Sequence, residues 1–498
     1  MTRDALMDET PLFDSAALRE VERRAADATG DAFELMRRAG RAAWRELVEH
    51  WPKAKRILVV CGPGNNGGDG YVLATHALMA GRDVMVVTLD SKPPVTELAR
   101  DACRAFTAAG GRVYAFAGDL PAADLVVDAL FGIGLSRPAE PHAASLIQAI
   151  NAHDTEVFSL DAPSGVDAER GGVPGAAVRA KRTLEFIACK VGLRTAAALD
   201  HVGVLGLATL EVDAFLTGIK PVATSIGAGA LSRWLHPRDR DSHKGRHGRV
   251  LCVGGELGGG GAIMLCAEAA LRCGAGLVDV ATRPAHTVAL LARLPEAMVH
   301  AADDVESTAD SFERADCIAV GPGLGQSAWA AALLQRALGS GLPLVLDADA
   351  LNLVAVQAGQ TPRDAVLTPH PGEAARLLGC SIADIQRDRI GAARNLVDRF
   401  GGTVVLKGAG TIVANTDGRM HLIAAGNPGM ATGGMGDVLT GVIASLIAQG
   451  LAPLDAAACG ALLHAVAGDC AATEGERGLM PSDLMPWLRR NANPGASE

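Results

Sequence analysis

The sequence predicts an α/β protein of two domains, each built on a mostly parallel β-sheet with helices on both faces. Short β-rich runs alternate with longer amphipathic runs, which is the pattern of repeated β-α-β units. A chain of 498 residues exceeds one ordinary hydrophobic core, and the alternation restarts in its second half. We therefore expect domains at residues 1–220 and 221–498, divided near residues 217–224, where glycine and proline loosen the chain.

Composition and charge exclude several classes of protein. Apolar residues make up 49% of the chain and charged residues 20%, which indicates a well-buried globular protein. The formal net charge of -10 disfavours binding to nucleic acid or to a membrane surface, because both carry negative charge. The N-terminal segment lacks the apolar core of a secretory signal, and glycine and proline interrupt residues 438–454, the longest uncharged stretch. We expect a cytoplasmic protein with no nucleic-acid or membrane partner.

Two further features concern redox state and self-association. The ten cysteines have no CxxC pair and no zinc-type spacing, so we expect buried thiols in a reducing compartment. The two-helix start and the alanine-rich stretch 456–467 either cover a second copy of the chain or complete the protein's own core. The sequence favours the core and leaves a homo-oligomer as the alternative.

The first half is expected to begin with two helices, at residues 15–28 and 31–50. Strands are expected at residues 56–61, 83–89, 112–115, 125–130, 156–160 and 184–188. The first of these strands runs into the glycine-rich loop 62–70, and a helix is expected to resume at 71–79. The loop contains G-x-G-x-x-G, a pattern typical of Rossmann-like, doubly wound dinucleotide folds but weak when it stands alone.

Polar side chains gather at three strand ends in this half. The loop 62–70 carries side chains that a simple pyrophosphate cradle does not need, namely Asn65, Asn66 and Asp69. A second glycine loop, 131–138, follows the strand that contains Asp128, and its Arg137 can bind a phosphate. Asp161 follows the next strand. Since ligands sit at the carboxyl ends of parallel strands, we expect the loops to converge, with Asp161 either serving a ligand or capping a turn.

The second half repeats the alternation of strands and helices. Strands are expected at residues 249–253, 277–281, 317–320, 343–346 and 403–406. The run 426–437 combines five glycines with Asp437 and leads directly into an apolar helix at 438–448. Glycines let N–H groups close around a phosphate, a helix start adds partial positive charge, and Asp437 adds a carboxylate. The run predicts phosphoryl chemistry on a small molecule, and the alternative is a plain turn.

Three other groups in the second half have both a chemical and a structural interpretation. Residues 407–411 follow a strand and either offer an ammonium, N–H groups and a hydroxyl to a nucleotide or form a turn with a surface lysine. Asp347 and Asp349 end a strand and either bind magnesium or cap the next helix. His370 lies between two prolines and either faces a substrate or supports its loop.

These motifs resemble those of the bifunctional NAD(P)H-hydrate repair enzymes. The first half is similar to their epimerase domain in the segments VVCGPGNNGGDGYVLA, VDALFGIGLSRP, SLDAPSGVDAERG and FIACKVGL. The second half is similar to their ADP-dependent dehydratase domain in the segments HKGRHGRVLCVGG, AEAALRCGAGLVDVAT, VGPGLG, LVLDADALN, LTPHPGEAARLLG, VVLKGAGTIVA and GNPGMATGGMGDVLTG. That domain is a relative of ribokinase-type sugar and vitamin kinases, so the resemblance implies a ribokinase-like α/β fold for the second half.

For the first domain, the resemblance implies exchange between the R and S epimers of hydrated NADH or NADPH (NADHX and NADPHX). The residues implied to bind this substrate are Asn65, Asn66, Gly67, Gly68, Asp69, Gly132, Ile133, Gly134, Leu135, Ser136, Arg137 and Pro138. A potassium ion is implied at Asn66, Asp128 and Ser164, whose oxygens suit a hard cation. Asp161 is implied to contact the substrate, and we hypothesise that its carboxyl alternates between acid and base. Lys190 is either a further substrate-side group or an exposed lysine at a strand end.

For the second domain, the resemblance implies dehydration of the S epimer with ADP as co-substrate, giving AMP and phosphate, at a site that uses Mg2+. It assigns the substrate to Ala262, Gly323 and His370. It assigns the nucleotide to Lys407, Gly408, Ala409, Gly410, Thr411 and Gly436. We hypothesise that Asp437 takes the proton of the ring hydroxyl while that oxygen attacks a nucleotide phosphate in line. In loop 256–261, the run Glu256-Leu257 followed by four glycines replaces the serine and tyrosine usually seen in the family. We expect this difference to change the stiffness of the loop near Ala262 more than the chemistry.

Two other functions share these motifs. A vitamin or sugar kinase fused to a dinucleotide-binding domain would use the same glycines and Asp437, and it would release a stable phosphorylated product. A nucleotide sensor would bind its ligand without converting it, and it would not need Asp161 and Asp437 at the strand ends. The sequence therefore favours the repair enzyme, while physical reasoning alone does not distinguish ADP from ATP.

Overall fold

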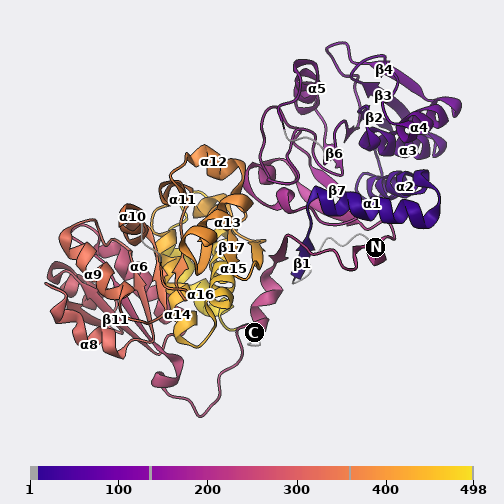
Figure 1. Cartoon of the computed structure of the whole chain (residues 1–498). Helices are drawn as coiled ribbons and strands as arrows, with labels where there is room; N and C mark the ends of the chain where they lie inside the picture. Colours follow the sequence, from indigo (N-terminus) through magenta and orange to yellow (C-terminus); the bar gives the residue numbers. More distant parts are fainter. Residues whose placement is uncertain (1–8, 134–136, 358–360, 496–498) are drawn as a thin grey trace. The chain divides into compact units, whose positions relative to one another are not determined.

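The computed structural model describes residues 9–495 apart from 134–136 and 358–360, and the chain forms two compact units (Figure 1). The first unit consists mainly of Thr10–Ala223 and the second mainly of Thr224–Glu498. Each unit has its own sheet and its own hydrophobic core. Both are α/β folds with largely parallel strands, so the expected fold class is confirmed.

The first unit is organised around a seven-stranded parallel sheet. In spatial order its strands are β4 (Arg112–Ala115), β3 (Asp83–Thr88), β2 (Arg56–Cys61), β5 (Leu125–Ala129), β6 (Val157–Leu160), β7 (Arg182–Phe186) and β8 (Val204–Ala208). The order reverses at β2, which pairs with both β3 and β5. The loops after β2 and β5 therefore flank the position where doubly wound sheets bind their ligands.

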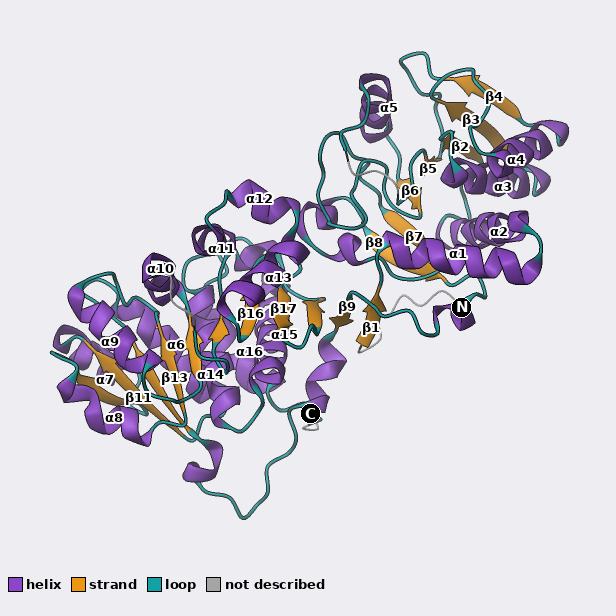
Figure 2. Ribbon diagram, viewed as in Figure 1, coloured by secondary structure: helices purple, strands orange, loops and turns teal. Residues whose placement is uncertain are grey.

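Helices cover both faces of this sheet (Figure 2). In chain order they are α1 (Ser15–Thr29), α2 (Ala32–His50), α3 (Asn65–Met79), α4 (Glu97–Ala108) and α5 (Pro141–Ala152). Alternate residues of β2 serve the two faces, because Ile57 and Val59 belong to the core under α1 to α4, whereas Leu58 and Val60 pack with α5. A strand buried on both faces explains the continuous apolar run in this part of the sequence.

Helix α3 begins earlier than the sequence predicts. It starts at Asn65, within the run expected to be loop. A Cβ on Gly67 would lie 2.0 Å from the carbonyl oxygen of Gly62, and a Cβ on Gly70 would lie 2.6 Å from the Cβ of Ala129. These glycines therefore allow the helix to pack closely on the strands, and the expectation of a loop as far as residue 70 was wrong.

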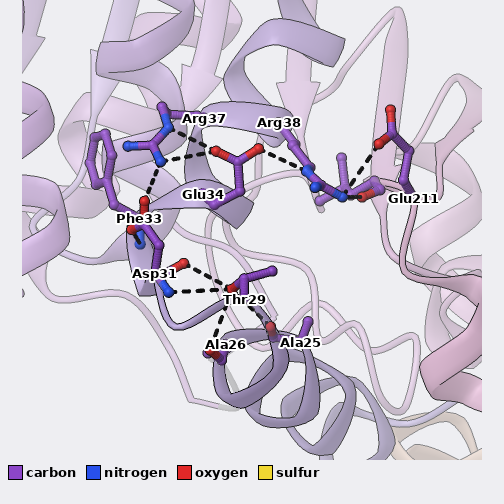
Figure 3. A network of polar contacts seen from close by, with 10 residues as sticks. Ala25, Ala26, Thr29, Asp31, Phe33, Glu34, Arg37, Arg38 and Glu211 are labelled. Atoms are coloured by element: carbon purple, nitrogen blue, oxygen red, sulfur yellow. Dashed lines mark hydrogen bonds and ion pairs between the residues drawn. The ribbon is translucent and has the colours of Figure 1, made fainter.

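Local polar contacts fix the turn between α1 and α2 (Figure 3). Asp31 caps α2 by accepting the backbone N–H two residues later at 2.9 Å. Within the next turn, Glu34 accepts from Arg37 at 2.9 Å and from Arg38 at 3.0 Å. Such solvent-accessible ion pairs orient side chains and each contribute little to the free energy of unfolding.

The second sheet has eleven strands, of which those from β9 to β12 in the spatial order below lie in the second unit. In spatial order its strands are β1 (Glu9–Leu12), β9 (Ala223–Ile226), β18 (Met420–Ile423), β17 (Ile412–Asn415), β16 (Thr403–Leu406), β15 (Val366–Leu367), β14 (Leu344–Leu346), β13 (Cys317–Val320), β10 (Arg249–Val253), β11 (Leu277–Thr282) and β12 (Met298–Ala301). The pairs of β17 with β16 and β18 are antiparallel, and the pairs from β16 to β12 are parallel. The carboxyl ends of the parallel strands therefore share one edge, where the second group of candidate residues lies.

Helices surround this sheet, and two of them form much of its core. They are α6 (Gly260–Arg272), α7 (Thr287–Arg293), α8 (Ala309–Arg314), α9 (Ala328–Leu338), α10 (Ala348–Gln357), α11 (Pro371–Leu378), α12 (Ile382–Arg387), α13 (Arg389–Phe400), α14 (Met435–Ala448), α15 (Pro453–Ala471) and α16 (Leu484–Asn491). Helices α14 and α15 are apolar on nearly all sides, and the alanine-rich part of α15 is buried within its own unit. By length and composition alone Pro453–Glu474 could cross a membrane, but 67% of its apolar window is buried, as in a core helix.

Candidate active sites

The strand ends of the first unit bring together several of the residues expected there. Asn66, in the first turn of α3, donates from Nδ2 to the carbonyl of Phe131 after β5 at 3.0 Å. A Cβ on Gly132 would lie 3.2 Å from Asp161 Oδ2 and 3.4 Å from Asn66 Cβ. The loops after β2, β5 and β6 therefore converge, and the glycine keeps open the space between Asn66 and Asp161.

Asp128 is the buried polar centre of this site. Its Oδ1 accepts from the Ser164 hydroxyl at 2.5 Å, and its Oδ2 accepts from the Ser164 N–H and the Ser159 hydroxyl, each at 2.8 Å. Burial raises the pKa of Asp128, and these hydrogen bonds act in the opposite direction. Beside them, Asn66 Oδ1 is a buried oxygen with no hydrogen-bond partner in the described part of the chain.

Asp161 follows β6 and forms an ion pair with Lys190. Its φ of 66° lies in the left-handed region, which residues other than glycine rarely adopt. The Lys190 ammonium lies 2.8 Å from Asp161 Oδ1, and the lysine is only 1% exposed. The interpretation of Lys190 as an exposed strand-end lysine was therefore wrong.

The other expected residues of the first site differ in burial. Asn65, Arg137 and Pro138 are exposed, Gly67 and Gly68 are buried, Ile133 is half-buried, and Gly134, Leu135 and Ser136 lie outside the described residues. The pKa of Asp69 is raised well above its ordinary value, first by burial and then by the negative charge of Asp161. Sequence reasoning missed Glu22 of α1, whose pKa is raised by burial and then by the same charge. No motif signals this residue, because it lies far from the strand ends in sequence.

In the second unit, the loops after β10 and β13 pack against each other. Glu256 N donates to Gly323 O at 2.6 Å. A Cβ on Gly259 would lie 2.5 Å from that same oxygen, so this approach requires glycine. Ala262 lies in the first turn of α6, directly after this loop. The structure therefore brings Ala262 and Gly323 to the same strand edge.

A buried ion pair joins Lys407 to Asp347 at the centre of this site. Lys407 Nζ lies 2.6 Å from Asp347 Oδ1 and 3.8 Å from Glu373 Oε2, and Thr440 donates its hydroxyl to Asp347 Oδ2 at 2.9 Å. Burial acts to lower the pKa of Lys407, but the two carboxylates outweigh it and raise that pKa. Burial likewise acts to raise the pKa of Asp347, and Lys407 outweighs it. The interpretation of Lys407 as a surface lysine was therefore wrong.

Asp437 lies in the first turn of α14, beside this ion pair. A Cβ on Gly436 would lie 3.0 Å from Lys407 Nζ and 3.4 Å from Asp347 Oδ2. The pKa of Asp437 is raised to about 7, first by burial and then by the negative charge of Asp347, while Lys407 acts to lower it. A carboxyl group with such a pKa is suited to act as a general base near neutral pH.

His370 supports the start of α11. Its Nδ1 accepts from Gly372 N at 2.9 Å and from Glu373 N at 3.3 Å, and Glu373 accepts from His370 N at 2.7 Å. This is the reciprocal pattern of a capping box. The side chain of His370 is half exposed, so it can contact a substrate while it also caps the helix.

A buried arginine that sequence reasoning missed holds the loop 407–411 from behind. Arg389 of α13 is 1% exposed and donates to Leu406 O at 3.1 Å and to Lys407 O at 3.2 Å. Gly408 has a φ of 128°, and a Cβ there would lie 3.1 Å from the guanidinium. Because helical arginines are ordinarily exposed, no sequence signal marks Arg389. Thr440 could have been found, since it lies one helical turn after Gly436 on the same face.

The folds and the two groups of residues define a two-domain α/β enzyme, with a dinucleotide-type site in one unit and a phosphoryl-transfer site in the other. A family model described as NAD(P)H-hydrate dehydratase matches residues 250–490, and one described as YjeF-related protein N-terminus matches residues 32–192. The bifunctional NAD(P)H-hydrate repair enzyme Nnr of Escherichia coli K12 is 46% identical over 484 residues, which cover 97% of this chain and 94% of that protein. The chain belongs to the family of bifunctional NAD(P)H-hydrate repair enzymes, as its motifs predicted.

Solved structures resemble the second unit. A ribokinase-like superfamily protein of Enterococcus faecalis V583 is 32% identical with a TM-score of 0.51, and the match covers 54% of this chain and 96% of that protein. The expected ribokinase-like fold is thereby confirmed. An ADP/ATP-dependent NAD(P)H-hydrate dehydratase of Bacillus subtilis, co-crystallized with ATP/Mg2+, is 29% identical with a TM-score of 0.48, and the match covers 53% of this chain and 95% of that protein.

Proposed function

We propose that this chain repairs hydrated NADH and NADPH in two steps, one in each unit. The first unit, proposed as an epimerase domain of residues 1–220, interconverts the R and S epimers of NADHX or NADPHX. The second, proposed as a dehydratase domain of residues 221–498, converts the S epimer into NADH or NADPH and consumes ADP, giving AMP and phosphate. Membership of the bifunctional family and the two separate strand-end sites support this assignment.

The observation that carries the dehydratase proposal is the position of Asp437 beside the ion pair of Lys407 and Asp347, with a pKa of about 7. Asp437 takes the proton of the ring hydroxyl, and the hydroxyl oxygen bonds to the terminal phosphorus of ADP. The bond from that phosphorus to the bridging oxygen breaks, and AMP leaves with the electron pair. The ring nitrogen then expels phosphate, a better leaving group than hydroxide. Loss of a proton from the adjacent ring carbon restores the dihydronicotinamide.

The remaining residues of the second unit are proposed to hold the two substrates. Residues 407–411 and Gly436 hold the nucleotide, where the Lys407 ammonium offsets phosphate charge and the start of α14 adds partial positive charge. Ala262, Gly323 and His370 face the hydrated ring. The contact between the loops after β10 and β13 supports this grouping, because it places Ala262 and Gly323 at one strand edge.

In the proposed epimerase step, the ring carbon loses its hydroxyl group as water and regains water on its other face. Asp161 protonates the departing hydroxyl group and then takes a proton from the returning water, so one carboxyl serves as acid and as base. Its Oδ2 faces the space kept open by Gly132, which is where the substrate is proposed to lie. Residues 65–69, at the start of α3, and residues 132–138 are proposed to bind the rest of the hydrated dinucleotide.

The oxygen atoms of the first site fit a potassium ion. Within the described residues, Asn66 Oδ1 is buried without a hydrogen-bond partner. Asn66 Nδ2 and the Ser164 hydroxyl both donate to Phe131 O, and the same hydroxyl donates to the buried Asp128 carboxylate. We propose that Asn66, Asp128 and Ser164 hold the ion, because such hard oxygen ligands suit an alkali cation. When bound, potassium supplies positive charge that offsets the buried carboxylate.

The acids of the second site do not fit a magnesium cage made by the protein. The carboxylate of Asp347 is paired with Lys407, and that of Asp349 accepts from Gly325 N at 2.9 Å and from the Asn352 amide at 3.3 Å. Mg2+ commonly keeps several waters and binds through substrate phosphates. We therefore propose Mg2+ only as a companion of the nucleotide phosphates, and none of the steps above depends on it.

The proposed partners are small molecules, and the proposed location is the cytoplasm. All ten cysteines are free thiols, and a reducing compartment maintains cysteines in that state.

An assay with hydrated NADH tests the proposed function. With purified chain and ADP, we expect the dihydronicotinamide absorbance to recover and AMP to appear in equal amount. With the pure R epimer, recovery requires the first unit as well as the second. No recovery and no AMP with either ADP or ATP would exclude the repair function. Accumulation of a stable phosphorylated alcohol would favour a kinase instead.

A further inference from the structure

We propose that Lys190 is a positioning residue of the epimerase site, which fixes one oxygen of Asp161 and leaves the other to face the substrate. The inference rests on the proposed function, since Lys190 has this task only if Asp161 exchanges protons with the hydrated ring. The sequence alone left Lys190 without a partner, and the structure supplies one at the strand edge of the first unit.

Three acceptors hold the Lys190 ammonium in place. Its Nζ lies 2.8 Å from Asp161 Oδ1, 3.1 Å from Phe186 O and 3.4 Å from Ala188 O. An ammonium has three donor hydrogens, so each has an acceptor within the protein. The side chain is 2% exposed, and water therefore competes little for these hydrogens. The position of the positive charge is fixed by the fold before any ligand binds.

A second ion pair fixes the backbone that carries Lys190. Its N–H donates to Glu185 Oε1 at 2.6 Å, and Arg194 binds Glu185 Oε2 at 2.6 Å and the Lys190 carbonyl at 3.0 Å. Within the same turn, Ile187 has a φ of 70°, a strained conformation for a β-branched residue. Observed strain of this kind is concentrated at functional sites, where the surroundings maintain an unfavourable conformation. The turn after β7 is therefore built to present the ammonium.

Asp161 is held in a matching way. Its N–H donates to Leu184 O at 2.8 Å, and its Oδ1 lies 2.8 Å from Lys190 Nζ and 3.4 Å from Phe186 N. The Oδ2 atom instead faces the space above Gly132, where a Cβ would lie 3.2 Å away. One oxygen is thus anchored within the protein, and the other faces the proposed position of the ring.

The charges around Asp161 explain why a cation is needed there. The negative charge of Asp161 adds to the effect of burial and raises the pKa of both Asp69 of α3 and Glu22 of α1. Lys190 and Arg19 act on Glu22 in the opposite direction. Without the ammonium, the Asp161 carboxylate would lie among acids with no direct counter-charge. The carboxyl would then turn away from the proposed position of the ring, and the geometry for proton transfer would be lost.

The test uses the full chain and the pure R epimer of hydrated NADH without ADP, so that only epimerisation is measured. For Lys190→Met we expect kcat for formation of the S epimer to fall by about 100-fold, with KM changed by less than about threefold. The matched control is Lys181→Met, because that lysine is 64% exposed and lies 3.7 Å from Glu156. Both variants should dehydrate the S epimer with ADP at the wild-type rate.

A double-mutant cycle with Asp161→Asn separates positioning from an independent role. If Lys190 acts through Asp161, the double variant should epimerise within about threefold of Asp161→Asn alone, since the two losses are not additive. Losses that multiply would overturn the proposal, because Lys190 would then act on the substrate by itself. If Lys190→Met does not fold, as judged by circular dichroism, the same cycle is run with Lys190→Gln.

The outcomes distinguish this inference from the proposed function. A wild-type chain that does not interconvert the epimers would overturn the epimerase assignment and the role of Lys190 together. An active wild-type chain with Lys190→Met at the wild-type rate would overturn the inference alone. A loss expressed only in KM would also contradict it, because an anchored Asp161 affects the chemical step.

Discussion

Each unit contains a buried lysine paired with a carboxylate, but the two units use the pair differently. In the first, Lys190 binds Asp161 itself, the proposed catalytic group, at 2.8 Å. In the second, Lys407 binds Asp347 at 2.6 Å, and Asp437 lies beside that pair. Burial and then the charge of Asp347 raise the pKa of Asp437 to about 7. A lysine paired with the proposed catalytic carboxyl, as in Lys190 with Asp161, holds that carboxyl in place. A lysine paired with a neighbouring acid, as in Lys407 with Asp347, leaves Asp437 with a raised pKa and makes it a stronger base.

The largest expected effect is the loss of dehydration in the second unit, with epimerisation in the first unit unchanged. Asp437→Asn should lower the rate of ADP-dependent dehydration by about 1,000-fold or more, because the amide cannot take the hydroxyl proton. AMP release and recovery of the dihydronicotinamide absorbance measure this rate. Epimerisation of the R epimer by the same variant should equal that of the wild type. The matched control is Asp417→Asn, an aspartate that is 45% exposed on a hairpin of the second unit.

The reciprocal change, in the first unit, should slow epimerisation alone. Asp161→Asn should still bind hydrated NADH but should interconvert its epimers about 100-fold more slowly, since the amide neither gives nor takes the proton. Exchange between epimers is followed by chromatography, and binding by calorimetry. The exposed residue Asp90, which is 53% accessible, supplies the control Asp90→Asn. Exchange by Asp161→Asn at the wild-type rate would remove Asp161 from the mechanism.

The pH dependence of the two activities sharpens the comparison. The base Asp437 must be ionised, and its pKa is about 7, so kcat/KM for dehydration should fall about tenfold for each pH unit below 7. Asp347→Asn removes a negative charge near Asp437 and should move this limb of the profile to lower pH. Rates measured with saturating ADP across this range test both statements. A limb that stays in place in Asp347→Asn would show that another group controls it.

The smallest expected effect concerns the support of the nucleotide loop. Arg389→Met should raise KM for ADP by about fivefold and leave KM for the hydrate unchanged, because the guanidinium holds the carbonyls of Leu406 and Lys407. The control is Arg394→Met, an exposed arginine on the same helix. Equal changes in both KM values would indicate a general loss of structure instead of a role at the loop.

Sequence reasoning placed both ends of five strands correctly and missed the two-residue strand β15. The bounds of β2, β4, β10, β13 and β16 agree with the expected runs, because each is a compact β-rich run between turn signals. Strand β15 contains only Val366–Leu367, which is too short to show the alternation of apolar and polar residues that marks a strand. The start of α3 was misplaced because its glycines are used for close packing, while the pattern of the sequence is that of a loop.

Local sequence patterns likewise predicted only part of the candidate sites. Strand-end position and residue type were enough to select Asp161, Lys407 and Asp437. The burial of Lys190 was not predictable, because it depends on Asp161, a residue from a different strand end, and on a turn with left-handed backbone at Ile187. Long-range pairs of this kind follow from tertiary packing, which local patterns in the sequence do not describe.

The central claim is that the ring hydroxyl of the hydrate becomes phosphorylated with the help of Asp437 before it leaves. The most direct test supplies the S epimer with a heavy oxygen isotope in that hydroxyl, together with ADP, and analyses the products by mass spectrometry. The account predicts that the label appears in the released inorganic phosphate. Label found in water, with none in phosphate, would contradict it.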